Sequence, residues 1–357
     1  MTASSERAAL SRAKRIVVKI GSRTLAGDMH VYARLAGAIA AAKGDRRSVV
    51  LVSSGAIALG TKKLGYRARP KEMSRLQAAA AAGQIVLMHA YDKAFSELGI
   101  TVAQVLLSHA DLADRTRSNN ARAALGALLE AGAVPILNEN DSVAVEEIKF
   151  GDNDQLSAMV APLVDADLLV LLSDVEGLLD KSGKRVSVVR DVATDALPLI
   201  RAATTGDVGT GGMASKIEAA RRATMAGANV VIADARVEGI IESILAGEDV
   251  GTLFIPARDR LSAKKYWIAF TLRPQGEIVL DRGAAEAVRA KGRSVLPIGV
   301  LGVRGDFRAT DSVRLLDPDG HELGRGLARL PAVDALMIAG KASDDVMVHR
   351  DEMVIWK

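Results

Sequence analysis

Residues 16–22, Ile-Val-Val-Lys-Ile-Gly-Ser, form an almost continuous apolar run that ends in a Gly-Ser turn. Runs of this kind, without polar alternation, are typical of strands that are covered on both faces. We expect a strand here and in five similar runs along the chain: Ser48–Val52, Val102–Leu107, Val134–Leu137, Leu168–Leu172 and Asn229–Ala233. Together, the six runs predict a sheet that is buried on both faces.

Longer segments rich in Ala and Leu separate these runs, and we expect them to be helices. They are Tyr32–Lys43, Glu72–Leu98, Ser118–Ala131, Asn153–Val164, Met213–Ala226 and Gly239–Leu245. Strands that alternate with helices over about 250 residues are typical of the α/β class. We predict a three-layer αβα sandwich around a mostly parallel central sheet.

The pattern changes near residue 255, where shorter strands and Gly/Asp/Pro turns replace the alternation. Strands are expected at Glu277–Leu280, Val300–Val303, Ser312–Leu316 and Val346–His349, with one helix at Ala284–Lys291. We predict a catalytic domain over 1–255, a linker over 256–273 and a small β-rich domain over 274–357.

The composition is that of an ordinary globular protein, with 49% apolar and 25% charged residues in 357. It excludes a disordered, collagen-like or coiled-coil chain. No cysteine is present, which excludes disulfides, thiolate metal centres and cysteine nucleophiles. No apolar run approaches the roughly 20 residues of a membrane span, and the net charge of +4 is small. We expect a cytoplasmic protein without membrane contact.

Two polar clusters follow predicted strands. Lys19 interrupts an apolar run, so its ammonium needs an anionic partner unless it reaches water from an edge strand. Ser54, in the stretch Ser53-Ser54-Gly55-Ala56-Ile57, could cap a helix or bind a carboxylate or phosphate.

Three further clusters lie at strand ends or helix starts. The segments Asn138-Glu139-Asn140-Asp141 and Gly151-Asp152-Asn153-Asp154 are compatible with a solvated acidic turn, a ligand site or Mg²⁺ binding. Glycines before a helix, in 209–216, can cradle phosphates or act as a hinge. Ser173 and Asp174 could contact a nucleotide or end a strand.

Taken in order, these motifs resemble the amino-acid kinase family, in its glutamate-phosphorylating branch. The quoted segments are Val18-Lys19-Ile20-Gly21-Ser22, Ser53-Ser54-Gly55-Ala56-Ile57, the Asn-Glu-Asn-Asp and Gly-Asp-Asn-Asp pair, and Gly209-Thr210-Gly211-Gly212-Met213-Ala214-Ser215-Lys216. The C-terminal part resembles a PUA domain. The resemblance covers almost the whole chain.

The resemblance implies ATP-dependent phosphorylation of the γ-carboxylate of L-glutamate to L-glutamyl 5-phosphate, the first step of proline biosynthesis. It implies that Lys19 and Lys216 are catalytic and that Asp154 orients both lysines. The implied glutamate-binding residues are Ser54, Asp141, Asn153, Asn138 and Asp152. The implied ATP-binding residues are Lys19, Ser173, Asp174, Thr210, Gly211, Gly212, Met213, Ala214, Ser215 and Lys216. Mg²⁺ is expected with ATP, and no residue is assigned as its ligand.

The resemblance also implies feedback inhibition by L-proline and a homo-oligomer, either a dimer or a tetramer. One alternative is another kinase of the same fold, acting on acetylglutamate, aspartate, carbamate or uridylate. A second alternative is an RNA-binding module that acts through the PUA-like domain. Residues 274–357 carry 12 Lys and Arg against 13 Asp and Glu, so RNA binding is not expected.

Overall fold

The computed structural model describes residues 3–27, 30–143, 153–203, 212–257 and 260–356. It divides the chain into two compact units, Met1–Arg260 and Leu261–Lys357, each with its own sheet. Residues 261–273, expected in the linker, are part of the second unit. There α13 (Ala263–Tyr266) and the π-helical turn η3 (Trp267–Thr271) bury aromatic side chains such as Phe270.

The first unit contains an eight-stranded sheet with the strand order β3-β4-β2-β1-β5-β7-β8-β6. The strands are β1 (Arg15–Ile20), β2 (Ser48–Ser53), β3 (Val102–Leu107), β4 (Val134–Glu139), β5 (Leu168–Ser173), β6 (Val188–Val189), β7 (Asn229–Asp234) and β8 (Thr252–Phe254). Every pair is parallel except β7 with β8. The mostly parallel sheet is confirmed, and the unpredicted strands β6 and β8 are too short to leave an apolar run.

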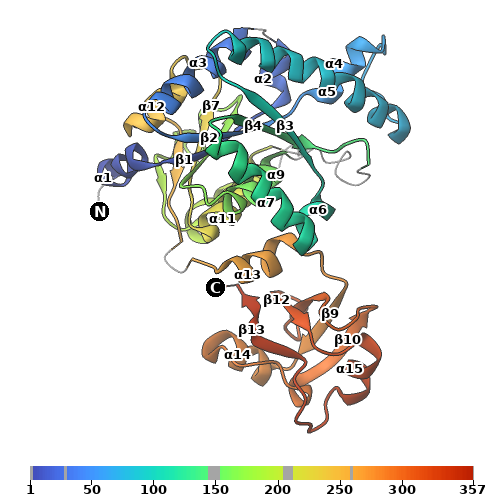
Figure 1. The fold of residues 1–357 in the computed structure, drawn as a ribbon. Coiled ribbons are helices and arrows are strands. Elements are labelled where there is room, and N and C mark those ends of the chain that lie inside the picture. The colour runs from blue at the N-terminus through green and yellow to red at the C-terminus, as the bar shows by residue number, and fades with distance from the viewer. Residues whose placement is uncertain (1–2, 28–29, 144–152, 204–211, 258–259, 357) are drawn as a thin grey trace. The chain divides into compact units, whose positions relative to one another are not determined.

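Helices cover both faces of this sheet (Figure 1). They are α1 (Ala3–Arg7), α2 (Ser22–Gly27), α3 (His30–Gly44), α4 (Ala56–Lys63), α5 (Met73–Ser96), α6 (His109–Ala113), α7 (Arg115–Glu130), α9 (Asn153–Leu163), α10 (Leu197–Ala203), α11 (Met213–Ala226) and α12 (Ile240–Ala246). Alternate residues of β1 face different layers. Val18 joins the core formed with α3, α5 and α12, whereas Val17 joins the core formed with α7, α9 and α11. The three-layer sandwich is confirmed.

The helices α4 and α5 pack backbone against backbone. A Cβ atom placed on Gly60 would lie 1.7 Å from the carbonyl oxygen of Ala79, and one on Gly83 would lie 1.8 Å from that of Ala56. No side chain fits at either glycine, because two atoms cannot approach so closely. The contact fixes the position of α5 relative to the segment that follows β2.

The second unit contains a five-stranded sheet with the order β10-β9-β11-β12-β13. Its elements are β9 (Gly276–Leu280), α14 (Arg282–Lys291), β10 (Val300–Gly305), β11 (Ser312–Leu316), β12 (Glu322–Ala328), α15 (Ala332–Ile338) and β13 (Val348–Ile355). The small β-rich domain is confirmed, but β12 was not predicted. Its Gly324 weakens the strand pattern, yet a Cβ atom there would lie 2.0 Å from the carbonyl oxygen of Val354.

Candidate active site

The parallel strands place their polar carboxyl-terminal residues side by side, along the row of strand ends that we call the sheet edge. Lys19 and Asn138 are the residues before the last of β1 and β4, and Ser173 ends β5. Ligands of open α/β sheets bind at this edge. Since β1 pairs with β2 on one side and with β5 on the other, Lys19 does not lie on an edge strand. The edge-strand interpretation of this lysine is therefore wrong.

Three charged side chains meet at the centre of this edge, and we call Lys19, Asp154 and Lys216 the ion triad. The ammonium of Lys19 lies 2.5 Å from Oδ1 of Asp154, and that of Lys216 lies 3.1 Å from Oδ2. All three are buried, with exposed fractions of 7%, 2% and 8%. One carboxylate thus holds two ammonium groups that come from β1 and α11, and the triad carries a net positive charge suited to a phosphate.

A second set of buried polar side chains lies beside the triad, and we call Gln84, Asn138 and Asn153 the amide network. Asn153 Nδ2 donates to Ser54 Oγ at 2.8 Å and to Asn138 Oδ1 at 3.0 Å. Asn138 Nδ2 donates to Gln84 Oε1 at 2.9 Å. The structure thus brings together three residues that the sequence predicted for one site, and it adds Gln84, which the sequence did not indicate.

The remaining acidic and glycine motifs are described only in part. Asp141 lies in the turn that follows β4, whereas Asp152, Thr210 and Gly211 lie outside the described residues. The other predicted phosphate-loop residues lie at the start of α11: Gly212, Met213, Ala214, Ser215 and Lys216. No side chain of the described part of the chain caps this helix, so its first N–H groups suit an anion. Gln155 Nε2 donates to the carbonyl oxygen of Ser215 at 3.1 Å and ties α9 to α11.

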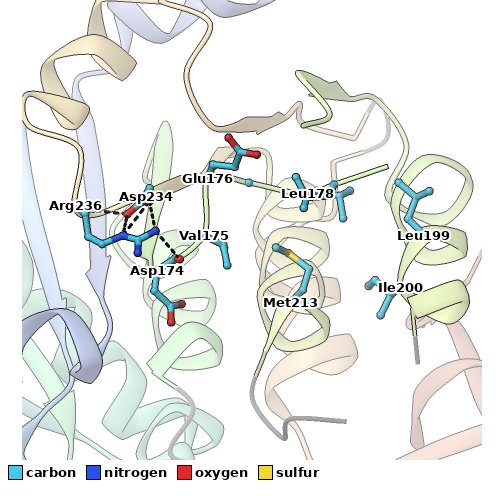
Figure 2. A pocket seen from close by; sticks show the side chains of 11 residues that line it. Asp174, Val175, Glu176, Leu178, Leu199, Ile200, Met213, Asp234 and Arg236 are labelled. Carbon is cyan, nitrogen blue, oxygen red and sulfur yellow. Dashed lines mark hydrogen bonds and ion pairs between the residues drawn. The ribbon is translucent and has the colours of Figure 1, made fainter. Parts of the chain in front are cut away.

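A cavity of about 530 Å³ lies next to the start of α11, at the ends of β5 and β7. Figure 2 shows an apolar side formed by Leu178, Leu199, Ile200 and Met213, across from a polar side. The polar side includes Asp174, Asp234 and Arg236, and Glu176 also lines the cavity. Its size and mixed lining fit a small-molecule ligand. Of the residues predicted to bind ATP, Asp174 and Met213 line this cavity.

Ion pairs keep two carboxylates of this cavity charged, those of Asp174 and Asp234. Arg23 hydrogen-bonds to Asp174 at 3.0 Å and lowers its pKa below the ordinary value. Arg236 hydrogen-bonds to Asp234 and lowers its pKa in the same way. The predicted residue Ser173 is buried, and its hydroxyl donates to Asp174 Oδ1 at 3.1 Å. Both carboxylates can therefore accept hydrogen bonds from the hydroxyl or amino groups of a ligand.

Three carboxylates at the ion triad and the cavity do not form a ready site for Mg²⁺. Asp154 is held by two ammonium groups, and Asp174 and Asp234 are each held by an arginine. Magnesium prefers unpaired carboxylate oxygens together with phosphates and water. The need for Mg²⁺ therefore stays a prediction.

Comparisons with known proteins agree with this architecture. The model of the amino acid kinase family matches residues 14–234, and that of the PUA domain matches residues 276–349. The chain therefore belongs to the amino acid kinase family, and it is a kinase. It is 45% identical to the glutamate 5-kinase of Pelobacter propionicus, over 96% of this chain and 97% of the relative.

Further relatives and a solved structure extend this comparison. Identity is 44% to the glutamate 5-kinase of Moorella thermoacetica, over 99% of this chain and 100% of the relative. The glutamate 5-kinase of Thermus thermophilus is 44% identical, over 96% and 97%. The structure of carbamate kinase from Giardia lamblia bound to AMP-PNP matches with a TM-score of 0.50 and 16% identity, over 69% of this chain and 100% of that chain. This last likeness supports the fold alone.

One finding concerns membranes. Among the helices of the described ranges, none has both the length and the apolar character needed to cross a bilayer.

Proposed function

We propose that this protein transfers the γ-phosphoryl group of ATP to the γ-carboxylate of L-glutamate. The product is L-glutamyl 5-phosphate, and the reaction opens proline biosynthesis. The observation that carries the proposal is the ion triad beside the amide network: a buried positive charge for phosphate lies next to a polar site for a small acceptor. Glutamate 5-kinases that match nearly the full chain support glutamate as that acceptor.

The chemistry needs positioning and charge rather than a base. A γ-carboxyl group with a pKa of about 4.3 is already ionised at neutral pH. One of its oxygens attacks the γ-phosphorus of ATP, the bond to the β,γ-bridging oxygen breaks, and ADP leaves with that electron pair. Because an anion must approach a polyphosphate, the ammonium groups of Lys19 and Lys216 stabilise the charge on the transferring group. Asp154 holds both in place.

The two substrates occupy neighbouring parts of the sheet edge in this proposal. The phosphates of ATP lie at the first turn of α11, with its glycines and Lys216, and the nucleoside enters the 530 Å³ cavity that Asp174 and Met213 line. Ser54, Asn138 and Asn153 hold glutamate, together with Asp141 and Asp152. The ion triad lies at the junction, where the phosphoryl group passes between them.

Trapping of the acyl phosphate with hydroxylamine tests the proposal. Purified protein is incubated with ATP, Mg²⁺ and one acceptor at a time: glutamate, N-acetylglutamate, aspartate, carbamate or uridylate. We expect hydroxamate with glutamate, and ADP release that depends on glutamate. Turnover of another acceptor in its place would assign the protein to a different kinase activity.

Three finer statements rest on the family resemblance. We propose that the protein acts in the cytoplasm, that it forms a dimer or tetramer, and that L-proline inhibits it. The hydroxylamine assay repeated with added proline tests the inhibition. Sedimentation velocity tests the oligomer.

A further inference from the structure

Two buried polar atoms of the amide network have no hydrogen-bond partner within the described part of the chain. They are Gln84 Nε2, a donor, and Asn153 Oδ1, an acceptor, on side chains that are 9% and 6% exposed. A buried polar atom without a partner is destabilising, and folded proteins usually supply one from the chain, water or a ligand. One donor and one acceptor without partners here fit a ligand that offers both an acceptor and a donor, as the α-carboxylate and α-ammonium groups of a free amino acid do.

Backbone groups fix which amide atoms are open. The N–H of Glu139 can only donate, and it donates to Asn138 Oδ1 at 2.9 Å. Asn138 therefore turns its Nδ2 toward Gln84, and this Nδ2 donates a hydrogen bond to Gln84 Oε1. The carbonyl oxygen of Ser53 can only accept, and it accepts from Asn153 Nδ2 at 3.0 Å. The open atoms are consequently the NH₂ group of Gln84 and the oxygen of Asn153.

The strand order, together with the hydrogen bond from Asn138, places Gln84 away from Lys19 along the sheet edge. Lys19 lies on β1 and Asn138 on β4, with β2 between them. Neighbouring strands are separated by about 4.8 Å, so the backbone of Asn138 lies roughly 10 Å from the backbone of Lys19 along the sheet edge. A glutamate whose γ-carboxylate lay at the ion triad would have room to extend its α-amino and α-carboxyl groups toward Asn138 and Gln84.

We propose that Gln84 is a specificity-determining residue whose Nε2 donates a hydrogen bond to the α-carboxylate of the substrate. Asn153 Oδ1 accepts from the adjacent α-ammonium. The substrate class is thus a free α-amino acid with an unmodified α-carboxylate and an acidic side chain. This inference rests on the proposed function, since it takes glutamate as the acceptor.

The first measurement uses the unmodified protein. Glutamate is compared with glutamate 1-amide, which keeps the γ-carboxylate but carries a carboxamide in place of the α-carboxylate. We expect kcat/KM to be lower for the amide by about tenfold to 100-fold, the range for a lost hydrogen bond to a charged group. Equal use of both acceptors would overturn the role of Gln84. No turnover of glutamate would overturn the proposed function as well, so the two failures are distinguishable.

The second measurement compares Gln84→Glu with wild type. Glutamate at position 84 keeps an oxygen for Asn138 Nδ2, but it removes the NH₂ group and adds a charge that repels the α-carboxylate. We expect the KM for glutamate to rise at least about tenfold, with the KM for ATP unchanged, and the preference over the 1-amide to shrink.

Gln77→Glu, on the same helix, is the matched control. It should change neither the KM for glutamate nor the preference for glutamate over its 1-amide. Thermal unfolding of each variant checks that it is folded. If Gln84→Glu does not fold, Gln84→Met, which removes the donor without adding charge, takes its place in the same comparison. An unchanged preference between glutamate and its 1-amide in a folded Gln84 variant would refute the inference.

Discussion

The substitution Asp154→Asn separates the electrostatic role of the ion triad from its shape. Asparagine keeps the volume of Asp154 but removes the charge that holds Lys19 and Lys216. At 3.1 Å, with an effective dielectric constant of about 20, the attraction between Asp154 and Lys216 alone is about 5 kcal/mol before desolvation. Loss of one partner from a buried ion pair costs about 3–5 kcal/mol, because the remaining charge has no counter-ion. For a protein of this size, the melting temperature should fall on the order of 10 °C.

The same substitution should affect catalysis and ATP binding in different directions. Without Asp154 the two ammonium groups lose their common anchor, and we expect kcat to fall about 100-fold to 1,000-fold. The KM for ATP should not rise, since two uncompensated positive charges attract the phosphates more strongly. Initial rates at varied ATP and differential scanning calorimetry measure both effects. A kcat within about threefold of wild type, with an unchanged melting temperature, would refute the reasoning.

Three further predictions concern single residues of the first unit. Lys216→Met should lower kcat about 100-fold in a folded protein, whereas Lys181→Met, at an exposed lysine, should not; the hydroxylamine assay measures both. Arg7→Met should lower the free energy of unfolding by several kcal/mol, measured by urea denaturation, because the buried guanidinium donates to the carbonyl oxygens of three residues in 248–251. Arg236 lowers the pKa of Asp234, so the stability from this pair is complete above about pH 4 and is lost as the pH falls through the lowered value. In calorimetry between pH 7 and pH 3, Arg236→Ala should lose less stability than wild type, because its Asp234 no longer has that partner.

Much of this architecture could be predicted because the sheet is buried on both faces. Its long strands leave continuous apolar runs, and the predicted bounds of β3 and of α11 agree with the structure. The shortest strands could not be predicted, since β6 and β8 have two and three residues and depend on pairing with distant neighbours. In the second unit, Gly324 weakens the strand pattern of β12. A glycine is needed there because the backbone of Val354 packs against it, a contact that the sequence does not indicate.

The candidate site shows the same limit. A lysine in an apolar strand indicates that an anionic partner is needed, but spacing along the chain does not identify that partner as Asp154. Gln84 follows a run of alanines in a long helix, where a polar residue usually faces solvent. Its burial depends on how α5 is placed over the sheet edge. A single sequence carries no local signal for that placement.

The contact between Gly60 and Gly83 has a consequence for altering the acceptor of this enzyme. Gly83 directly precedes Gln84, and Gly60 lies on the helix that begins just after Ser54. The helices on two sides of the proposed glutamate site are therefore joined where not even a methyl group can be inserted. A longer or bulkier acceptor cannot be accommodated by spreading these helices apart through substitutions along their seam. Redesign of the selectivity has to proceed through the side chains that project from the pair, with the spacing of its axes left as it is.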